Sequence, residues 1–126
     1  MTAASTWWKE FSSFSSWITP PVDAWGCNAL GNYTFSTSFN LIKYDSSKYF
    51  LNVEVASDDA LIGIHVNDVA VPLLGPCTKD NNFATCTVKY SLNSNFKAGT
   101  NTISFLVNNA AGADINPVGL NANFIL

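Results

Sequence analysis

The fold of this chain is decided by the stretch Phe96-Lys97-Ala98-Gly99-Thr100-Asn101-Thr102-Ile103-Ser104-Phe105-Leu106-Val107-Asn108-Asn109. After a turn that contains Gly99, one face carries Ile103, Phe105 and Val107, and the other carries Thr102, Ser104 and Leu106. Successive side chains of a β-strand point to opposite faces, so this pattern predicts a strand with one face on a core. A polar loop ending in Asn116-Pro117-Val118-Gly119-Leu120 follows, and then a second alternating run with Leu120, Ala122 and Phe124. Two such strands predict the end of a β-sandwich.

The same two-residue period recurs upstream. It predicts the strands Asn32–Leu41, Lys48–Ala56, Leu61–Val66, Val69–Leu73 and Thr85–Leu92. The first would carry Tyr33, Phe35, Thr37, Phe39 and Leu41 on one face, with Asn32, Thr34, Ser36, Ser38 and Asn40 on the other. The second would turn inward Tyr49, Leu51, Val53 and Val55, with Asn52 and Glu54 outward. Composition predicts turns at Tyr44–Ser47, at Ser57-Asp58-Asp59 and, as a tight turn, at Asn67-Asp68.

These elements predict an all-β domain of about eight antiparallel strands, a β-sandwich with jelly-roll topology. We place the sandwich domain at residues 17–126, after an aromatic segment at residues 1–16. Aromatic residues recur there at spacings of three and four, as on one face of a helix: Trp7, Trp8, Phe11, Phe14 and Trp17. The serines between them are poor helix formers, so we expect a short helical turn or an irregular edge segment. This segment would pack on the domain or on a partner.

Charged residues make up only 12% of the chain, and arginine is absent. The net charge is -3 and the six lysines are scattered, which argues against nucleic acid and against an anionic membrane surface as partners. No apolar run approaches the roughly 20 residues that cross a bilayer. A neutral Asn/Ser/Thr surface favours an extracellular or surface-associated protein. Met1 to Phe11 lacks the features of a signal peptide, so we expect an excised domain or another export route.

The three cysteines are an odd number. Cys77 and Cys86 bracket a short polar loop, and we predict a disulfide between them that would stabilise the fold by about 2–3 kcal/mol. Cys27 would be left over as a small buried side chain. Alternatively, in a reducing compartment, all three are free thiols. No CxxC pair occurs and the only histidine, His65, is remote in sequence from the cysteines, so no metal site is predicted.

Several short motifs together resemble the galactose-binding-domain-like β-sandwiches, the jelly rolls of carbohydrate-binding modules and exported surface proteins. The motifs are Trp17-Ile18-x-Pro20, Gly31-Asn32-Tyr33-Thr34-Phe35, Phe39-x-Leu41, Ser57-Asp58-Asp59, Val66-Asn67-Asp68, Phe96-x-x-Gly99-x-Asn101-x-Ile103-x-Phe105 and Asn116-Pro117-x-Gly119-Leu120. Many relatives have Asn-Gly where this chain has Asn67-Asp68. The resemblance implies a non-catalytic domain that binds glycans, proteins or lipids, or serves structure alone. It also implies a ligand site on the loops at one end or on a concave face, with a structural calcium ion elsewhere.

A sugar-binding site needs exposed aromatic rings beside carboxylate or amide side chains. The candidate ligand-binding residues lie in three loops: Trp17, Asp23 and Trp25; Asp58 and Asp59; Asn109, Asp114 and Asn116. Each also has a structural interpretation. The tryptophans would fill the core, Asp58 would cap its turn, and the last three would satisfy loop backbone groups. Asp58, Asp59 and Asp114 could serve calcium, but no Dx[DN]x[DN]G loop supports a metal site.

Catalysis is not predicted. His65 lies between Ile64 and Val66 without a nucleophile elbow nearby, and we expect it on the solvent face of a strand. The adjacent carboxylates of Asp58 and Asp59 should diverge, unlike a working acid/base pair.

Two functions remain open. The first is a carbohydrate-binding or adhesion module of an exported or surface protein, with a glycan as partner. The second is a structural subunit of a surface assembly, filament or virion, with neighbouring protein subunits as partners. Self-association through exposed aromatics would favour the second: Trp7, Trp8, Phe11 and Phe14.

Overall fold

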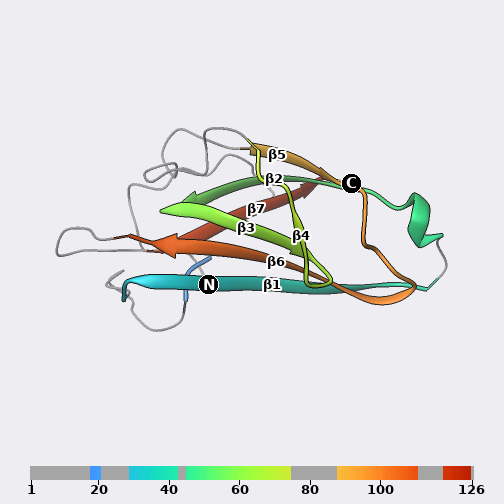
Figure 1. Cartoon of the computed structure of the whole chain (residues 1–126), viewed down its shortest axis with the longest axis horizontal. Coiled ribbons are helices and arrows are strands. Elements are labelled where there is room, and N and C mark those ends of the chain that lie inside the picture. The colour runs from blue at the N-terminus through green and yellow to red at the C-terminus, as the bar shows by residue number, and fades with distance from the viewer. Residues whose placement is uncertain (1–17, 21–28, 43–44, 75–87, 111–117, 126) are drawn as a thin grey trace.

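The computed structural model describes residues 18–20, 29–42, 45–74, 88–110 and 118–125. In these ranges the chain forms two antiparallel sheets that face each other as a β-sandwich (Figure 1). The strands are β1 (Gly31–Leu41), β2 (Leu51–Asp58), β3 (Ala60–Val66), β4 (Val69–Val71), β5 (Val88–Leu92), β6 (Gly99–Asn109) and β7 (Gly119–Ile125). The four-stranded sheet has the order β1-β6-β3-β4 and the three-stranded sheet the order β5-β2-β7. The predicted all-β sandwich is confirmed, with seven strands in the described residues.

The alternation predicted for β6 is confirmed. Ile103, Phe105 and Val107 are 0%, 2% and 0% exposed, while the residues between them are half-buried. β6 pairs along its whole length with β1, from Gly31 opposite Asn109 to Leu41 opposite Gly99. On its other side it pairs with β3, so β6 is an interior strand that is hydrogen-bonded to a neighbour on each side.

The three-stranded sheet closes the core from the other side. Leu51, Val53 and Val55 of β2 point inward as predicted and are buried. Their partners on the same face include Leu120, which is buried, and Phe124, which packs against the core. The rings of Phe105 and Phe124 meet edge to face across the two sheets at a centroid distance of 6.2 Å, a favoured arrangement of aromatic pairs.

The predicted tight turn at Asn67-Asp68 is also confirmed. Asn67 and Asp68 have φ angles of 49° and 66° and connect β3 to β4. Two residues with positive φ match the right-handed twist of a hairpin, and Asn and Asp tolerate this region better than most residues.

An amide network ties this turn to the start of β6. The side chain of Asn101 is fully buried, and its Oδ1 accepts hydrogen bonds from the Lys97 backbone N (2.8 Å) and from Asn67 Nδ2 (2.8 Å). Its Nδ2 donates to the carbonyl oxygens of Lys97 (2.8 Å) and Gly99 (3.0 Å). Asn67 Oδ1 in turn accepts from the Thr102 N–H at 2.9 Å. Asn101 therefore braces two loops that are distant in sequence.

The turn predicted at Ser57-Asp58-Asp59 is wrong. Ser57 and Asp58 are the last residues of β2 and are 0% and 2% exposed. Asp59 alone separates β2 from β3, where the chain passes from one sheet to the other. The composition suits a turn, but tertiary pairing supplies these polar groups with partners: the Asp59 N–H donates to the Asn108 carbonyl (3.2 Å), and Ser57 Oγ to the Asp59 carbonyl (3.2 Å). Because these polar groups have hydrogen-bond partners, they can be buried inside the fold.

Candidate functional site

The three described members of the predicted ligand set lie at one end of the sandwich. Asp59 Oδ2 accepts a hydrogen bond from the Ala110 N–H at 2.8 Å, next to Asn109 at the end of β6. Asn109 Nδ2 donates to the Ala29 carbonyl at 3.0 Å. Asp58 and Asn109 are 2% and 1% exposed. The structure thus brings these residues together, and their contacts hold the β2–β3 crossover against β6, which favours a structural role at this end.

The other predicted site residues lie outside the described part of the chain. They are Trp17, Asp23, Trp25, Asp114 and Asn116, together with the predicted disulfide pair Cys77 and Cys86, the leftover Cys27, and the aromatic residues Trp7, Trp8, Phe11 and Phe14.

Within the described ranges, no three His, Cys, Asp or Glu side chains are grouped as a metal ion would require. The described residues also contain no helix long and apolar enough to cross a membrane. His65 is half-buried on β3, opposite Ser104 of β6 and Ala70 of β4.

A surface hollow lies elsewhere, over the three-stranded sheet. It has a volume of about 330 Å³ and is lined by Asn52, Val53, Lys89, Tyr90, Ser91 and Ile125. Ligand pockets begin at about this size. Asn52 and Asp58 are six residues apart on β2, so at about 3.3 Å per residue the hollow lies roughly 20 Å from the Asp58 end.

The alternation of the strands explains which groups reach this surface. Since Leu51, Val53 and Val55 face the core, Asn52 and Glu54 face outward. Asn52 lies between Ser91 of β5 and Ile125 of β7. Beside it, Lys89 Nζ lies 3.4 Å from Glu54 Oε1. The lysine side chain is 77% exposed and the glutamate side chain only 18%, so the ion pair contributes little to stability and leaves the lysine accessible.

Phe50 adds an exposed aromatic ring at the same end of the sheet. Its side chain is 61% exposed. The neighbouring Tyr49 is extended (φ -75°, ψ 137°) and packs inward, with its ring 4.9 Å from that of Phe96 in an edge-to-face contact. Because adjacent side chains of an extended chain point to opposite sides, Phe50 points outward, on the side of Asn52.

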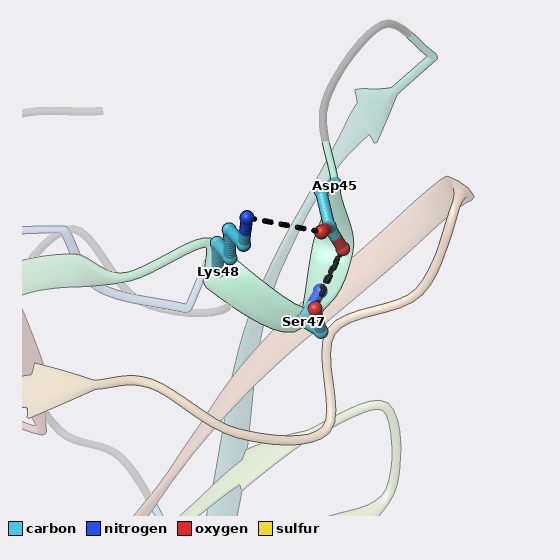
Figure 2. Close-up of polar contacts among 3 residues, drawn as sticks. All are labelled: Asp45, Ser47 and Lys48. Carbon is cyan, nitrogen blue, oxygen red and sulfur yellow. Dashed lines mark hydrogen bonds and ion pairs between the residues drawn. The ribbon is translucent and has the colours of Figure 1, made fainter.

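A short 3₁₀ helix, Ser46–Lys48, directly precedes Tyr49 and Phe50 (Figure 2). Asp45 caps it, and Asp45 Oδ1 accepts hydrogen bonds from Ser47 Oγ at 2.6 Å and from the Ser47 N–H at 3.0 Å. Lys48 Nζ lies 4.0 Å from Asp45 Oδ2. These bonds from Ser47 lower the pKa of Asp45 because they favour the ionised carboxylate. The predicted turn in this region is thus a capped helical turn in its described residues.

Sequence reasoning missed Phe50, although a signal was present. The same alternation that turned Tyr49 and Leu51 inward assigns Phe50 to the outward face. A large aromatic residue at an outward position of a strand, next to a polar one, is the pattern of an exposed platform.

The outer face of β1 and β6 offers a contrasting surface. Its side chains bond to one another in pairs across the strands: Asn32 with Asn108, Ser36 with Ser104 and Ser38 with Thr102, each at 2.9 Å. Part of their hydrogen-bonding capacity is therefore used in these cross-strand pairs. This face is thus a weaker candidate for a ligand site than the hollow lined by Asn52.

Comparison with models of protein families, with curated proteins and with solved structures finds no match for this chain. The resemblance to galactose-binding-domain-like proteins therefore stays a prediction, and function has to be argued from the geometry of the surface.

Proposed function

We propose that this domain is a non-catalytic carbohydrate-binding or adhesion module of an extracellular or surface-associated protein. It would bind glycans on the outer face of β5, β2 and β7. The observation that carries this proposal is the exposed ring of Phe50, two residues before Asn52, which lines a hollow together with Ser91.

The chemistry of the surface fits a sugar better than a charged or wholly apolar ligand. A pyranose ring presents an apolar face of C–H groups, which can lie on the phenyl ring of Phe50. Its hydroxyl groups can both donate and accept, which matches the amide of Asn52 and the hydroxyl of Ser91. Lys89, which is paired with Glu54 at 3.4 Å, adds a donor at the hollow. A shallow, solvent-exposed site of this kind would bind weakly and gain strength from repetition along a polysaccharide.

The test compares the full chain with Phe50→Ala and Leu30→Ala on a glycan array, followed by titration of retained glycans. Leu30 is a matched control because it is 62% exposed, against 61% for Phe50, and directly precedes β1 of the four-stranded sheet rather than β2 of the proposed binding face. Loss of the stacking contact should weaken binding by about tenfold or more, while Leu30→Ala should bind like the parent. Absence of any retained glycan, or equal weakening by both variants, would refute the proposal.

One observation favours the second function, a structural subunit that packs through its strands. β1 is eleven residues long, forms the edge of its sheet among the described strands and contains neither a charged residue nor proline. Long uncharged edges of this type accept strands from other molecules. Assembly would then appear in light scattering as a mass that rises with protein concentration, and a constant monomer mass up to millimolar concentration would exclude it.

A further inference from the structure

Three of the sheet edges formed by the described strands carry features that discourage the addition of a further strand. β4 has only three residues and is followed by Pro72, and β5 carries Lys89. β7 is bridged by Ile18, which exchanges backbone hydrogen bonds of 2.9 and 3.0 Å with Leu120. Short strands, proline, lysine and a covering segment are all means by which natural sheets protect their edges.

In the part of the chain that the structure describes, the fourth edge, β1, has none of these features (Figure 1). It is eleven residues long, contains neither a charged residue nor proline, and seven of its residues are exposed. Its register with β6 runs without a shift from Gly31 opposite Asn109 to Leu41 opposite Gly99, so no bulge turns the strand away. β1 is therefore the described edge to which another strand would add most readily.

This same strand holds a modification motif. Asn32-Tyr33-Thr34 is an Asn-x-Ser/Thr triplet, the acceptor for N-linked glycosylation, and it is the only such triplet in the sequence. Asn32 and Thr34 are two residues apart on a strand, so their side chains share the outer face of the sheet, where both are exposed. Tyr33 between them packs against the core, and its Oη donates to the Ala29 carbonyl at 2.8 Å. A glycan on Asn32 would therefore point away from the core.

The amide of Asn32 is oriented for this modification. Its Oδ1 accepts a hydrogen bond from Asn108 Nδ2 at 2.9 Å, across the pair of strands β1 and β6. This bond turns the oxygen toward β6 and leaves Nδ2, the atom that receives the sugar, without a hydrogen-bond partner among the described residues. Attachment of a sugar would thus break no described hydrogen bond of the sheet.

We propose that Asn32 is N-glycosylated and that the glycan protects the β1 edge from strand addition. A transferase would deliver the oligosaccharide from a polyprenyl-pyrophosphate donor. The bond between the anomeric carbon and the phosphate oxygen breaks, and a bond from that carbon to Asn32 Nδ2 forms. The amide nitrogen loses one proton, and the lipid pyrophosphate leaves.

The protection follows from the spacing of strands in a sheet. A strand added to β1 would lie about 4.8 Å away and would place one of its side chains directly opposite Asn32. The first sugar on Asn32 would occupy this space, so the glycan and an added strand exclude each other. The inference rests on the extracellular location in the proposed function, because glycosylation requires passage through the compartment that holds the transferase. It does not depend on glycan binding at the hollow lined by Asn52.

Mass spectrometry of the full chain, secreted from a eukaryotic cell that makes N-linked glycans, tests the modification. The parent should exceed its protein mass of 13.6 kDa by one glycan, and a peptide-N-glycosidase should remove that excess. Thr34→Ser preserves the triplet and should be modified, whereas Thr34→Ala removes the triplet but keeps Asn32 and should not be modified. An unmodified parent, or a glycan that persists in Thr34→Ala, would overturn the inference without affecting the array result for Phe50→Ala.

Light scattering over a concentration series tests the protective role. The glycosylated parent should keep a constant monomer mass, whereas the mass of secreted Thr34→Ala should rise with concentration. The parent chain made in a host without the transferase is the matched control, because it lacks the glycan but keeps Thr34, and it should associate like Thr34→Ala. A constant monomer mass for both unmodified chains, or association of the glycosylated parent, would refute the protective role.

A displaced glycan provides a rescue experiment. Adding Ile42→Thr to Thr34→Ala creates a new triplet that begins at Asn40, which is exposed on the same outer face of β1. Ile42 is 77% exposed, so the fold should tolerate its replacement. The fraction glycosylated at Asn40 should regain the monomer mass. Continued association of this fraction would show that the chains pair through a surface other than β1 and would overturn the proposed protection.

Discussion

Replacing Asn101 with alanine removes the brace that joins the β3–β4 turn to the start of β6. The side chain is 0% exposed and takes part in four hydrogen bonds of 2.8–3.0 Å, two as acceptor and two as donor. A typical hydrogen bond contributes about 1 kcal/mol net, and a buried group left without its partner costs about 1–3 kcal/mol. The four bonds together predict a loss of about 4 kcal/mol in the free energy of unfolding. Since domains are stable by about 5–15 kcal/mol, this is a large fraction of the total.

The assay is urea denaturation followed by tryptophan fluorescence, with Asn40→Ala as the matched control. Asn40 is exposed on β1 near the same end, opposite Thr100, and its loss should change the stability by less than about 0.5 kcal/mol. The midpoint of Asn101→Ala should fall without a change in slope, because the same surface is exposed on unfolding. A loss below about 1 kcal/mol would refute the reasoning, since the network would then be replaceable by water.

Further predictions concern three other positions. Gly99 has a φ of +89°, and a methyl group on its Cα would meet no atom within 4 Å, so Gly99→Ala should cost about 1–2 kcal/mol through backbone strain alone, as measured by thermal denaturation. Asp59→Ala removes the 2.8 Å bond to the Ala110 N–H and should cost about 1–3 kcal/mol, and unchanged stability in urea would contradict its role at the crossover. Asp45 should titrate below its ordinary pKa of 3.8, and Ser47→Ala should raise that pKa toward the ordinary value in an NMR titration. Because the folded-state pKa is lowered, the small stabilisation is present above pH 3.8 and is lost as the pH falls through the folded-state pKa.

Much of the fold follows from local patterns. The two-residue period of β6 and β2 predicted which side chains form the core, and the Asn67-Asp68 pair predicted its hairpin. Both succeed because strand alternation and positive φ angles depend on a few neighbouring residues. The candidate site was harder to predict. The carboxylates of Asp58 and Asp59 suggest a surface turn, yet Asp58 is buried and Asp59 bonds to Ala110, 51 residues away.

By itself the sequence determined the strand periods, the hairpin turn and the neutral polar surface, since these depend on residue type and near neighbours. Only the tertiary structure decided the pairing of β1 with β6 and the path of Ser57 and Asp58 into the interior. It also decided that Asn52, two residues after the exposed Phe50, lines a surface hollow and that Ile18 bridges to Leu120 of β7. The physical reason is that hydrogen-bond partners and burial depend on segments far apart in the chain, which meet only when the two sheets pack.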